Sequence, residues 1–126
     1  MIDVDGLVRT EEEVDVLFFE VGVHVYGVDA SQVQRIERAL PGDLVRPELG
    51  ALHQGRRALV FDTPEGEAHL KVDVVRGVRP INVADLRRLP AAVTASSFAI
   101  GVCLEEEAHP ILLIDLVETA KTQGRH

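Results

Sequence analysis

Histidines are the side chains of this sequence best suited to metal binding and to proton transfer near neutral pH. There are five, and none follows another at a metal-ligand spacing such as H-x-x-x-H. They are His24, His53, His69, His109 and His126. Isolated polar positions on strands or turns account for them, so the sequence predicts no metal site.

The nucleophilic side chains are equally isolated. Cys103 lies in FAIGVCLEE, a predicted strand, without a second cysteine at C-x-x-C spacing. A reactive thiol needs a base and a setting that lowers its pKa, and the flanking residues provide neither, so a buried, inert thiol is predicted. Ser31, Ser96 and Ser97 lack a G-x-S-x-G setting, and no Walker or G-x-G-x-x-G loop occurs. We therefore expect no cofactor.

Two runs of glutamate, Glu11–Glu13 and Glu105–Glu107 with the nearby His109, could be imagined as acid–base groups. Consecutive residues on a hairpin turn point to different sides and face water, so these carboxylates are expected to be solvated. Without a catalytic constellation, the sequence favours a binding module over an enzyme.

Length and composition fit one domain with an aliphatic core. The chain has 126 residues, 46% of them hydrophobic but only 4% aromatic, and valine dominates, which favours β-structure. The formal charge of −8 disfavours nucleic acid and anionic membrane surfaces as partners. No apolar run approaches the roughly 20 residues that a membrane helix needs.

The N-terminal stretch and the cysteine usage favour a cytoplasmic location. MIDVDGLVRTEEE has neither the basic region nor the apolar region of a signal peptide. A single cysteine cannot form an internal disulfide, which is typical of a reducing compartment.

The first half of the chain predicts a hairpin followed by a helix. Val14–Val21 and Val23–Tyr26 are expected strands that meet at Gly22. The apolar period then becomes helical, which predicts a helix over 29–40 with Asp29 as N-cap and Gln32 in a capping box. The apolar stripe of that helix comprises Ala30, Val33, Ile36 and Leu40.

The second half repeats this pattern after an irregular segment, 41–56, that is rich in proline and glycine. The expected elements are strands at 58–61, 70–75, 98–104 and 110–115, a turn at 63–66, a short helical turn at 82–89, a small-residue connection at 91–97 and a helix at 116–121. Strand, tight turn, strand and short helix ending in Leu-Pro thus occur twice, so we expect two similar β modules packed face to face.

These patterns carry a family resemblance. A strand, a glycine, a strand with Tyr-Gly-Val-Asp and then Val-x-x-Ile resembles the opening of CheW-like domains, and LKVDVVRGVRPI and FAIGVCLEEEAHPILLIDLVETA are similar to later parts of the same family. The residues that match at the opening are Phe18, Phe19, Gly22, Tyr26, Gly27, Val28, Asp29, Val33 and Ile36. The likeness covers about 14–37 and 57–119.

The resemblance implies an all-β fold with short helices, built from two small packed SH3-like β-barrel subdomains. It also implies an adaptor without enzymatic activity that binds the cytoplasmic coiled coil of a chemoreceptor and a CheA-type histidine kinase or other CheW-like proteins in receptor arrays. We expect a loose arm at 1–13, one domain at 14–122 (an abridged subdomain at 14–56 and a second at 57–122), and a frayed tail at 123–126.

The chain departs from the family pattern at 38–56, which is short and lacks the usual Asn-Leu-Arg-Gly. One alignment removes a strand pair here, and another places GALHQGRRALVFDT on that hairpin and removes the next strand. Arg35 also stands where the family tends to have glutamate. The pattern resembles short CheW-like adaptors of Frz-type pathways in gliding bacteria. This predicts a retained receptor-binding face and a lost or altered kinase-binding face.

The predicted interface follows from the resemblance. Receptor and kinase contacts of the family fall on or before the first helix, and residues of the irregular segment could cover the gap, line an open sheet edge or form a homodimer contact. The candidates are Val28, Val33, Arg35, Ile36, Leu44, Val45, Leu49 and Leu52. Val33 and Ile36 are equally well explained as core residues of the apolar stripe.

Two other functions remain open at this stage. A small ligand-binding domain or enzyme could use the cleft between the modules, with His53, His69 and Arg56 as loose candidates. A self-assembling β domain with no receptor is the third possibility. Dependence of its position in the cell on receptors would separate the adaptor from this structural protein.

Overall fold

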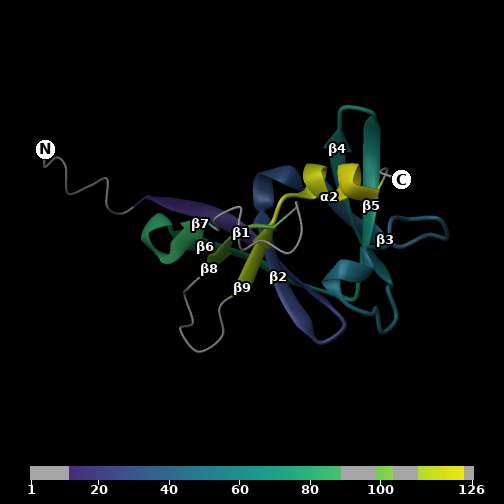
Figure 1. Ribbon diagram of the computed structural model, residues 1–126, viewed down its shortest axis with the longest axis horizontal. Coiled ribbons are helices and arrows are strands. Elements are labelled where there is room, and N and C mark those ends of the chain that lie inside the picture. The colour runs from purple at the N-terminus through teal and green to yellow at the C-terminus, as the bar shows by residue number, and fades with distance from the viewer. Residues whose placement is uncertain (1–11, 89–98, 104–110, 124–126) are drawn as a thin grey trace, which may run out of the picture.

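The computed structural model describes residues 12–88, 99–103 and 111–123, which form two curved β-sheets around a shared core, with one α-helix at the end of the chain (Figure 1). The mostly β fold predicted from the sequence is confirmed. Of the predicted arm and tail, Glu13 already belongs to the first strand and Gln123 ends the helix. The connection at 91–97 and the turn at Glu105–Glu107 lie outside the described residues.

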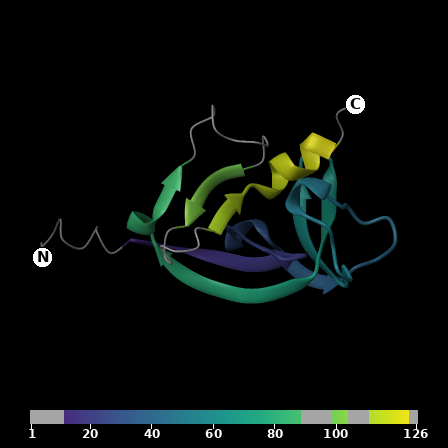
Figure 2. The same ribbon diagram turned by 60° about the horizontal axis from the view of Figure 1, so that its bottom comes forward.

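The larger sheet has six strands in the order β6-β1-β2-β9-β8-β7. Its strands are β1 (Glu13–Val21), β2 (His24–Asp29), β6 (Val74–Asn82), β7 (Leu86–Arg88), β8 (Ala99–Cys103) and β9 (Ile111–Ile114). Neighbouring strands are antiparallel except β2 and β9, which are parallel. β6 pairs with almost the whole of β1 and curves from the smaller sheet to the far end of the larger one (Figure 2).

The smaller sheet has three antiparallel strands in the order β3-β4-β5. These are β3 (Arg35–Arg38), β4 (Arg57–Thr63) and β5 (Gly66–Val72). Outside the named strands, Leu44 forms a parallel bridge to Leu70 of β5. A single turn of 3-10 helix, η2 (Pro47–Leu49), is the other regular feature of 39–56.

Hydrogen bonding groups the strands differently from their order along the chain. β1 and β2 join β6–β9 in the larger sheet, and the smaller sheet comes from 35–72. The boundary expected between 56 and 57 remains a proposal about subdomains, and it falls between β3 and its partner β4.

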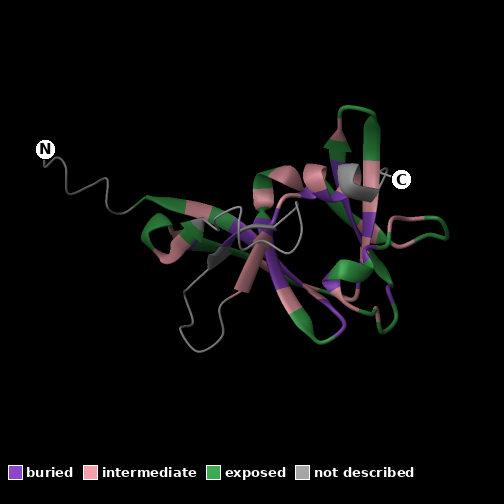
Figure 3. Ribbon diagram, viewed as in Figure 1, coloured by how far each residue is buried: buried purple, intermediate pink, exposed green. Residues whose placement is uncertain are grey.

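The main core lies between the two sheets and is closed by α2 (Leu116–Gln123), the predicted terminal helix (Figures 1 and 3). Its buried members are Leu17, Phe19, Val21, Tyr26, Val28, Leu49, Leu59, Phe61, Leu70, Val72, Ile114 and Leu116. A smaller cluster of Val16, Phe18 and Ile81 packs inside the curl of the larger sheet. Burying one such side chain contributes roughly 1.5–3 kcal/mol, so strands from both sheets depend on the shared cluster.

The helix predicted at 29–40 is wrong beyond its first turn. Asp29 does act as N-cap, because its Oδ1 accepts a hydrogen bond from the Ser31 N–H at 2.9 Å. However, only η1 (Ala30–Gln32) is helical, and the chain is extended from Val33 into β3. Pairing with the edge of β4 satisfies backbone groups of β3 and places Ile36 opposite the buried Leu59, and the β-branched side chains of Val33 and Ile36 suit extended structure.

Gln32 does not complete a capping box. Its Oε1 instead accepts a hydrogen bond from the Leu116 N–H at 3.1 Å, at the start of α2. Two segments separated by 84 positions are thereby joined, which no local pattern could indicate.

The helical turn predicted at 82–89 is confirmed at its start and wrong from Leu86 to Arg88, which form a strand. Asn82 caps η3 (Val83–Asp85) by accepting from the Ala84 N–H at 2.8 Å, but the chain then enters β7, which pairs with β8. The sequence repeat therefore corresponds to a hairpin followed by a capped 3-10 turn and a short strand, with β6 inserted in the second copy.

Asp73 marks the bend between β5 and β6 and joins three parts of the chain. Its carboxylate accepts hydrogen bonds from four backbone N–H groups, and its own N–H donates to the Glu20 carbonyl at 2.8 Å. Burial alone would raise its pKa, but the four N–H donors outweigh burial and hold the pKa well below its usual range. The donors are Gly22 (2.6 Å), His53 (2.9 Å), Gln54 (2.8 Å) and Gly55 (2.7 Å).

The turn at Gly22 requires glycine for two reasons. Its φ is +61°, and an added Cβ would overlap the carbonyl oxygen of Ala51. We expect Gly22→Ala to lower the free energy of unfolding by about 1–3 kcal/mol, since backbone strain and the clash act together. Gly42→Ala is the matched control, because Gly42 has φ +93° with open space around its Cβ position. Equal losses in chemical denaturation would contradict the proposed clash.

Asp73→Asn tests the carboxylate directly. The folded-state pKa is depressed, so the carboxylate contributes stability above the unfolded pKa of about 3.9, and this contribution is lost as pH falls below that value. We expect a loss of about 1–2 kcal/mol at neutral pH, reduced by solvent screening because the group is partly exposed. The difference in free energy of unfolding between wild type and variant should become smaller below about pH 4.

Denaturation of both proteins between neutral and acidic pH provides the measurement. Asp43→Asn is the control, because the Asp43 carboxylate accepts one backbone N–H, that of Leu40, at 2.8 Å. If the difference in free energy of unfolding between wild type and Asp73→Asn did not change with pH, the proposed role of the ionised carboxylate would be wrong.

Candidate functional site

The residues proposed for a catalytic or ligand-binding cleft do not converge. His53 is exposed and contributes its backbone N–H to Asp73, while His69 lies on β5 with its Nε2 3.4 Å from Glu67. His69 lines a pocket of about 320 Å³ with Asp43 and Glu67, whereas Arg56 lines a different one. Within the described ranges, no cluster of histidine, cysteine and acidic residues could hold a metal ion.

Several other chemistry-bearing residues contribute nothing to a site in the described chain. His24 lies beside the Tyr26 ring, with the two ring centres 6.3 Å apart. His109, His126, Ser96 and Ser97 fall outside the described residues. A helix long and apolar enough to cross a membrane is not found among the residues that the structure describes.

Two of the predicted interface residues are interior. Val28 is fully buried in the main core, and Leu49 is 2% exposed. The Tyr26 hydroxyl donates a hydrogen bond to the Leu49 carbonyl at 2.5 Å, and burial raises the pKa of Tyr26. Leu49 therefore anchors the irregular segment to the larger sheet, and neither side chain is available to a partner.

Three more candidates, Val33, Leu44 and Leu52, are partly buried and pack against the main core. Leu44 also extends the smaller sheet, because its N–H donates to the His69 carbonyl and its carbonyl accepts from the Lys71 N–H, both at 2.9 Å. This backbone pairing covers part of the β5 edge, one of the roles expected for these residues.

Arg35, Ile36 and Val45 are the candidates that remain exposed. Ile36 lies directly opposite Leu59, so its side chain is on the core-facing side of the sheet. It is nevertheless 39% exposed, because β3 is an edge strand and no described strand lies beyond it. A strand prediction for 35–38 would have placed Ile36 and Arg38 on this inner face together.

Arg35 lies on the opposite, outer face of the same sheet. Its guanidinium reaches across β4 to the Glu67 carboxylate on β5, with bonds of 2.9 and 3.0 Å, and also pairs with Glu37. The guanidinium is the largest cause holding the pKa of Glu67 below its usual range. Val60 of β4 lies directly opposite Arg35 and is fully buried, and we infer from this register that the stem of Arg35 covers it.

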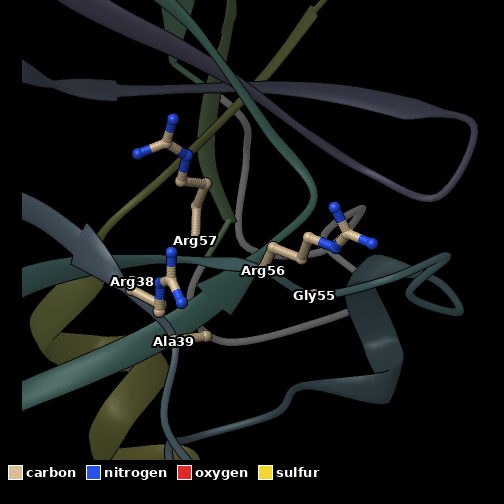
Figure 4. A pocket seen from close by; sticks show the side chains of 5 residues that line it. All are labelled: Arg38, Ala39, Gly55, Arg56 and Arg57. Carbon is tan, nitrogen blue, oxygen red and sulfur yellow. The ribbon is translucent and has the colours of Figure 1, made fainter.

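A basic pocket of about 520 Å³ opens at the end of the smaller sheet, and of its lining residues the sequence analysis named only Arg56, as a loose candidate for a cleft. Figure 4 shows the Arg38 and Arg57 side chains extending in the same direction from neighbouring strands, with Arg56 directed to the side. Ala39 and Gly55 complete the lining. The Arg-Arg pair at 56–57 was visible in the sequence, but its pairing with Arg38 depends on strand register.

Comparison with known proteins gives two informative matches, although no family model matches this chain. The chain is 66% identical over 112 residues to the frizzy aggregation protein FrzB of Myxococcus xanthus, which covers 89% of this chain and 99% of FrzB. The structure is similar to the scaffolding protein CheW of Thermoanaerobacter tengcongensis, with a TM-score of 0.65 and 18% identity over 82% of this chain and 89% of that one.

Two substitutions of Arg35 distinguish the contribution of its charge from that of its apolar stem, which is inferred to cover Val60. We expect Arg35→Ala to lower the midpoint of thermal unfolding, because it exposes Val60 and frees Glu67, while Arg35→Met should retain most of the stability. Arg87→Ala on the larger sheet is the control for removing one exposed arginine. If Arg35→Met unfolds as early as Arg35→Ala, the ion pair matters and the apolar cover does not.

Proposed function

The chain belongs to the FrzB family of CheW-like proteins, and from this premise we propose that it is a scaffold or adaptor of a bacterial chemosensory pathway that binds the cytoplasmic coiled coil of a chemoreceptor. The single observation that carries the proposal is the 66% identity to FrzB, which extends over nearly the full length of that protein. The CheW-like fold supports the same conclusion.

The arrangement of side chains supports a binding role over catalysis. Among the described residues, no group of histidine, cysteine and acidic side chains could hold a metal ion, and His53 does not line the pocket that His69 lines. We accordingly propose an adaptor without enzymatic activity, located in the cytoplasm at receptor arrays.

We further propose that the kinase-binding face of this adaptor is lost or altered. Segment 39–56 contributes one bridge residue, Leu44, and one 3-10 turn in place of strands. The neighbouring edge strand β3 keeps Ile36 exposed on the core-facing side and Arg35 on the outer side. Together with Val45, these are the predicted interface residues that the fold leaves accessible.

A titration against two partners tests the proposal. The purified chain is titrated with a receptor cytoplasmic coiled-coil fragment and, separately, with the CheW-like domain of the kinase. We expect binding to the receptor fragment and binding at least about tenfold weaker, or none, to the kinase domain. Binding to neither partner would refute the adaptor proposal, and equal binding to both would refute loss of the kinase face.

A matched pair of variants locates the receptor contact. Ile36→Ser should weaken receptor binding about tenfold if Ile36 is buried in the complex. Val23→Ser is the control, because Val23 is 80% exposed in the β1–β2 turn and belongs to none of the predicted interface positions. Circular dichroism on both variants checks that the fold is retained.

A further inference from the structure

The basic pocket at the end of the smaller sheet brings like charges close together, which lowers the stability of the fold. Arg38 of β3 and Arg57 of β4 are direct cross-strand partners, so their side chains extend from the same face of the sheet. Like charges in this arrangement destabilise an antiparallel pair. Arg56, the next residue along, adds a third guanidinium to the lining of the same pocket (Figure 4).

None of these three arginines forms an ion pair with a residue that the structure describes. Elsewhere in the described chain, Arg35, Arg46 and Arg76 each have a carboxylate partner. The Asp73 carboxylate follows Val72, the residue opposite Arg57, but it is held by four backbone N–H groups. The chain has 21 acidic residues against 13 lysines and arginines, yet no described acidic residue forms an ion pair with these three arginines.

Exposed apolar residues lie close to Arg38 along the chain. Ile36 lies two residues before Arg38 on the same face of β3 and is 39% exposed, and Leu40, two residues after it, is 53% exposed. Ala39 lines the pocket itself. The surface therefore combines three guanidiniums with accessible aliphatic carbon, a composition suited to an amphipathic protein segment more than to a free ion.

We propose that this pocket docks a carboxylate-rich, amphipathic segment of a partner protein, whose acidic side chains pair with Arg38, Arg56 and Arg57. A guanidinium presents paired N–H donors that match a carboxylate in two-point geometry, and desolvation in a pocket strengthens such pairs. The chain's net charge of −8 opposes any anionic partner over longer distances, so the preference for an amphipathic peptide over nucleic acid rests on the exposed aliphatic side chains of Ile36 and Leu40. This surface shares Ile36 with the proposed receptor contact, but the proposal rests on the three arginines and does not depend on receptor binding.

Binding of two labelled peptides tests the inference, measured by fluorescence anisotropy on the full chain. One peptide alternates glutamate and leucine at helical spacing, and the other has glutamine in place of every glutamate. We expect the glutamate peptide to bind, to weaken as salt is raised, and to lose about tenfold or more in affinity with Arg38→Gln/Arg57→Gln. The glutamine peptide should bind at least about tenfold more weakly to the wild type.

The control is Lys71→Gln/Arg87→Gln, which removes the same charge from the outer face of β5 and from β7. It should leave the affinity for the glutamate peptide unchanged. Thermal unfolding gives a second readout, because relief of the repulsion between Arg38 and Arg57 should leave the pocket variant as stable as the wild type or more stable. A pocket variant that is less stable would show that these arginines serve the fold.

Three further outcomes would overturn the proposal. The first is absence of binding by the glutamate peptide, and the second is equal binding to the wild type and the pocket variant. The third is preferential binding of inorganic polyphosphate or a single-stranded oligonucleotide, which would make the pocket a phosphate site. Failure of the receptor titration would leave this peptide result unaffected, so the two proposals fail separately.

Discussion

The Asp73 carboxylate is the interaction on which the rest of the structure depends. It receives N–H groups from the β1–β2 turn at Gly22 and from consecutive residues at 53–55, at the bend where the chain leaves the smaller sheet for the larger. Segment 39–56 has few partners for its backbone within regular structure, and unpaired backbone groups are costly. One ionised side chain therefore fixes the end of this segment to both sheets.

Two further attachments hold the segment between its ends. The Tyr26 hydroxyl binds the Leu49 carbonyl, and the Leu44 backbone pairs with β5. With these in place, a chain too short to add strands still covers part of the core, since Leu44 and Leu52 pack against it. The inner face of β3 is left uncovered, and this is why Ile36 is exposed opposite the buried Leu59.

The sequence predicted the β1–β2 hairpin well. It predicted β3 and β7 wrongly as helical, and it wrongly predicted one strand over 70–75, where the chain bends at Asp73 between β5 and β6. Hairpins such as β1–β2 depend on local alternation and a glycine turn, which a short window contains. The stripe of Ala30, Val33 and Ile36 has helical spacing, and the extended structure of 33–38 is decided instead by pairing with the distant strand β4. Gln32 shows the same limit, because its partner is Leu116.

The functional surface was predicted only in part because exposure depends on register. Val28 and Ile36 are both β-branched residues near the family-like motif, yet one is fully buried and the other is at an open edge. The basic pocket was missed because it requires Arg38 to lie opposite Arg57, 19 positions away along the chain. Neither relation is visible before the strands are paired.

Exposed sheet edges often invite another strand, and β3 is protected against this by charge. Three of its four residues, Arg35, Glu37 and Arg38, are charged, which disfavours pairing with a second copy of the same strand. Arg35 and Glu37 are engaged on the outer face by their ion pairs, whereas Arg38 and Ile36 are presented on the inner face. The edge of this sheet thus favours contacts through side chains over the addition of another strand. Side-chain contacts can distinguish one partner from another, which specific recognition requires.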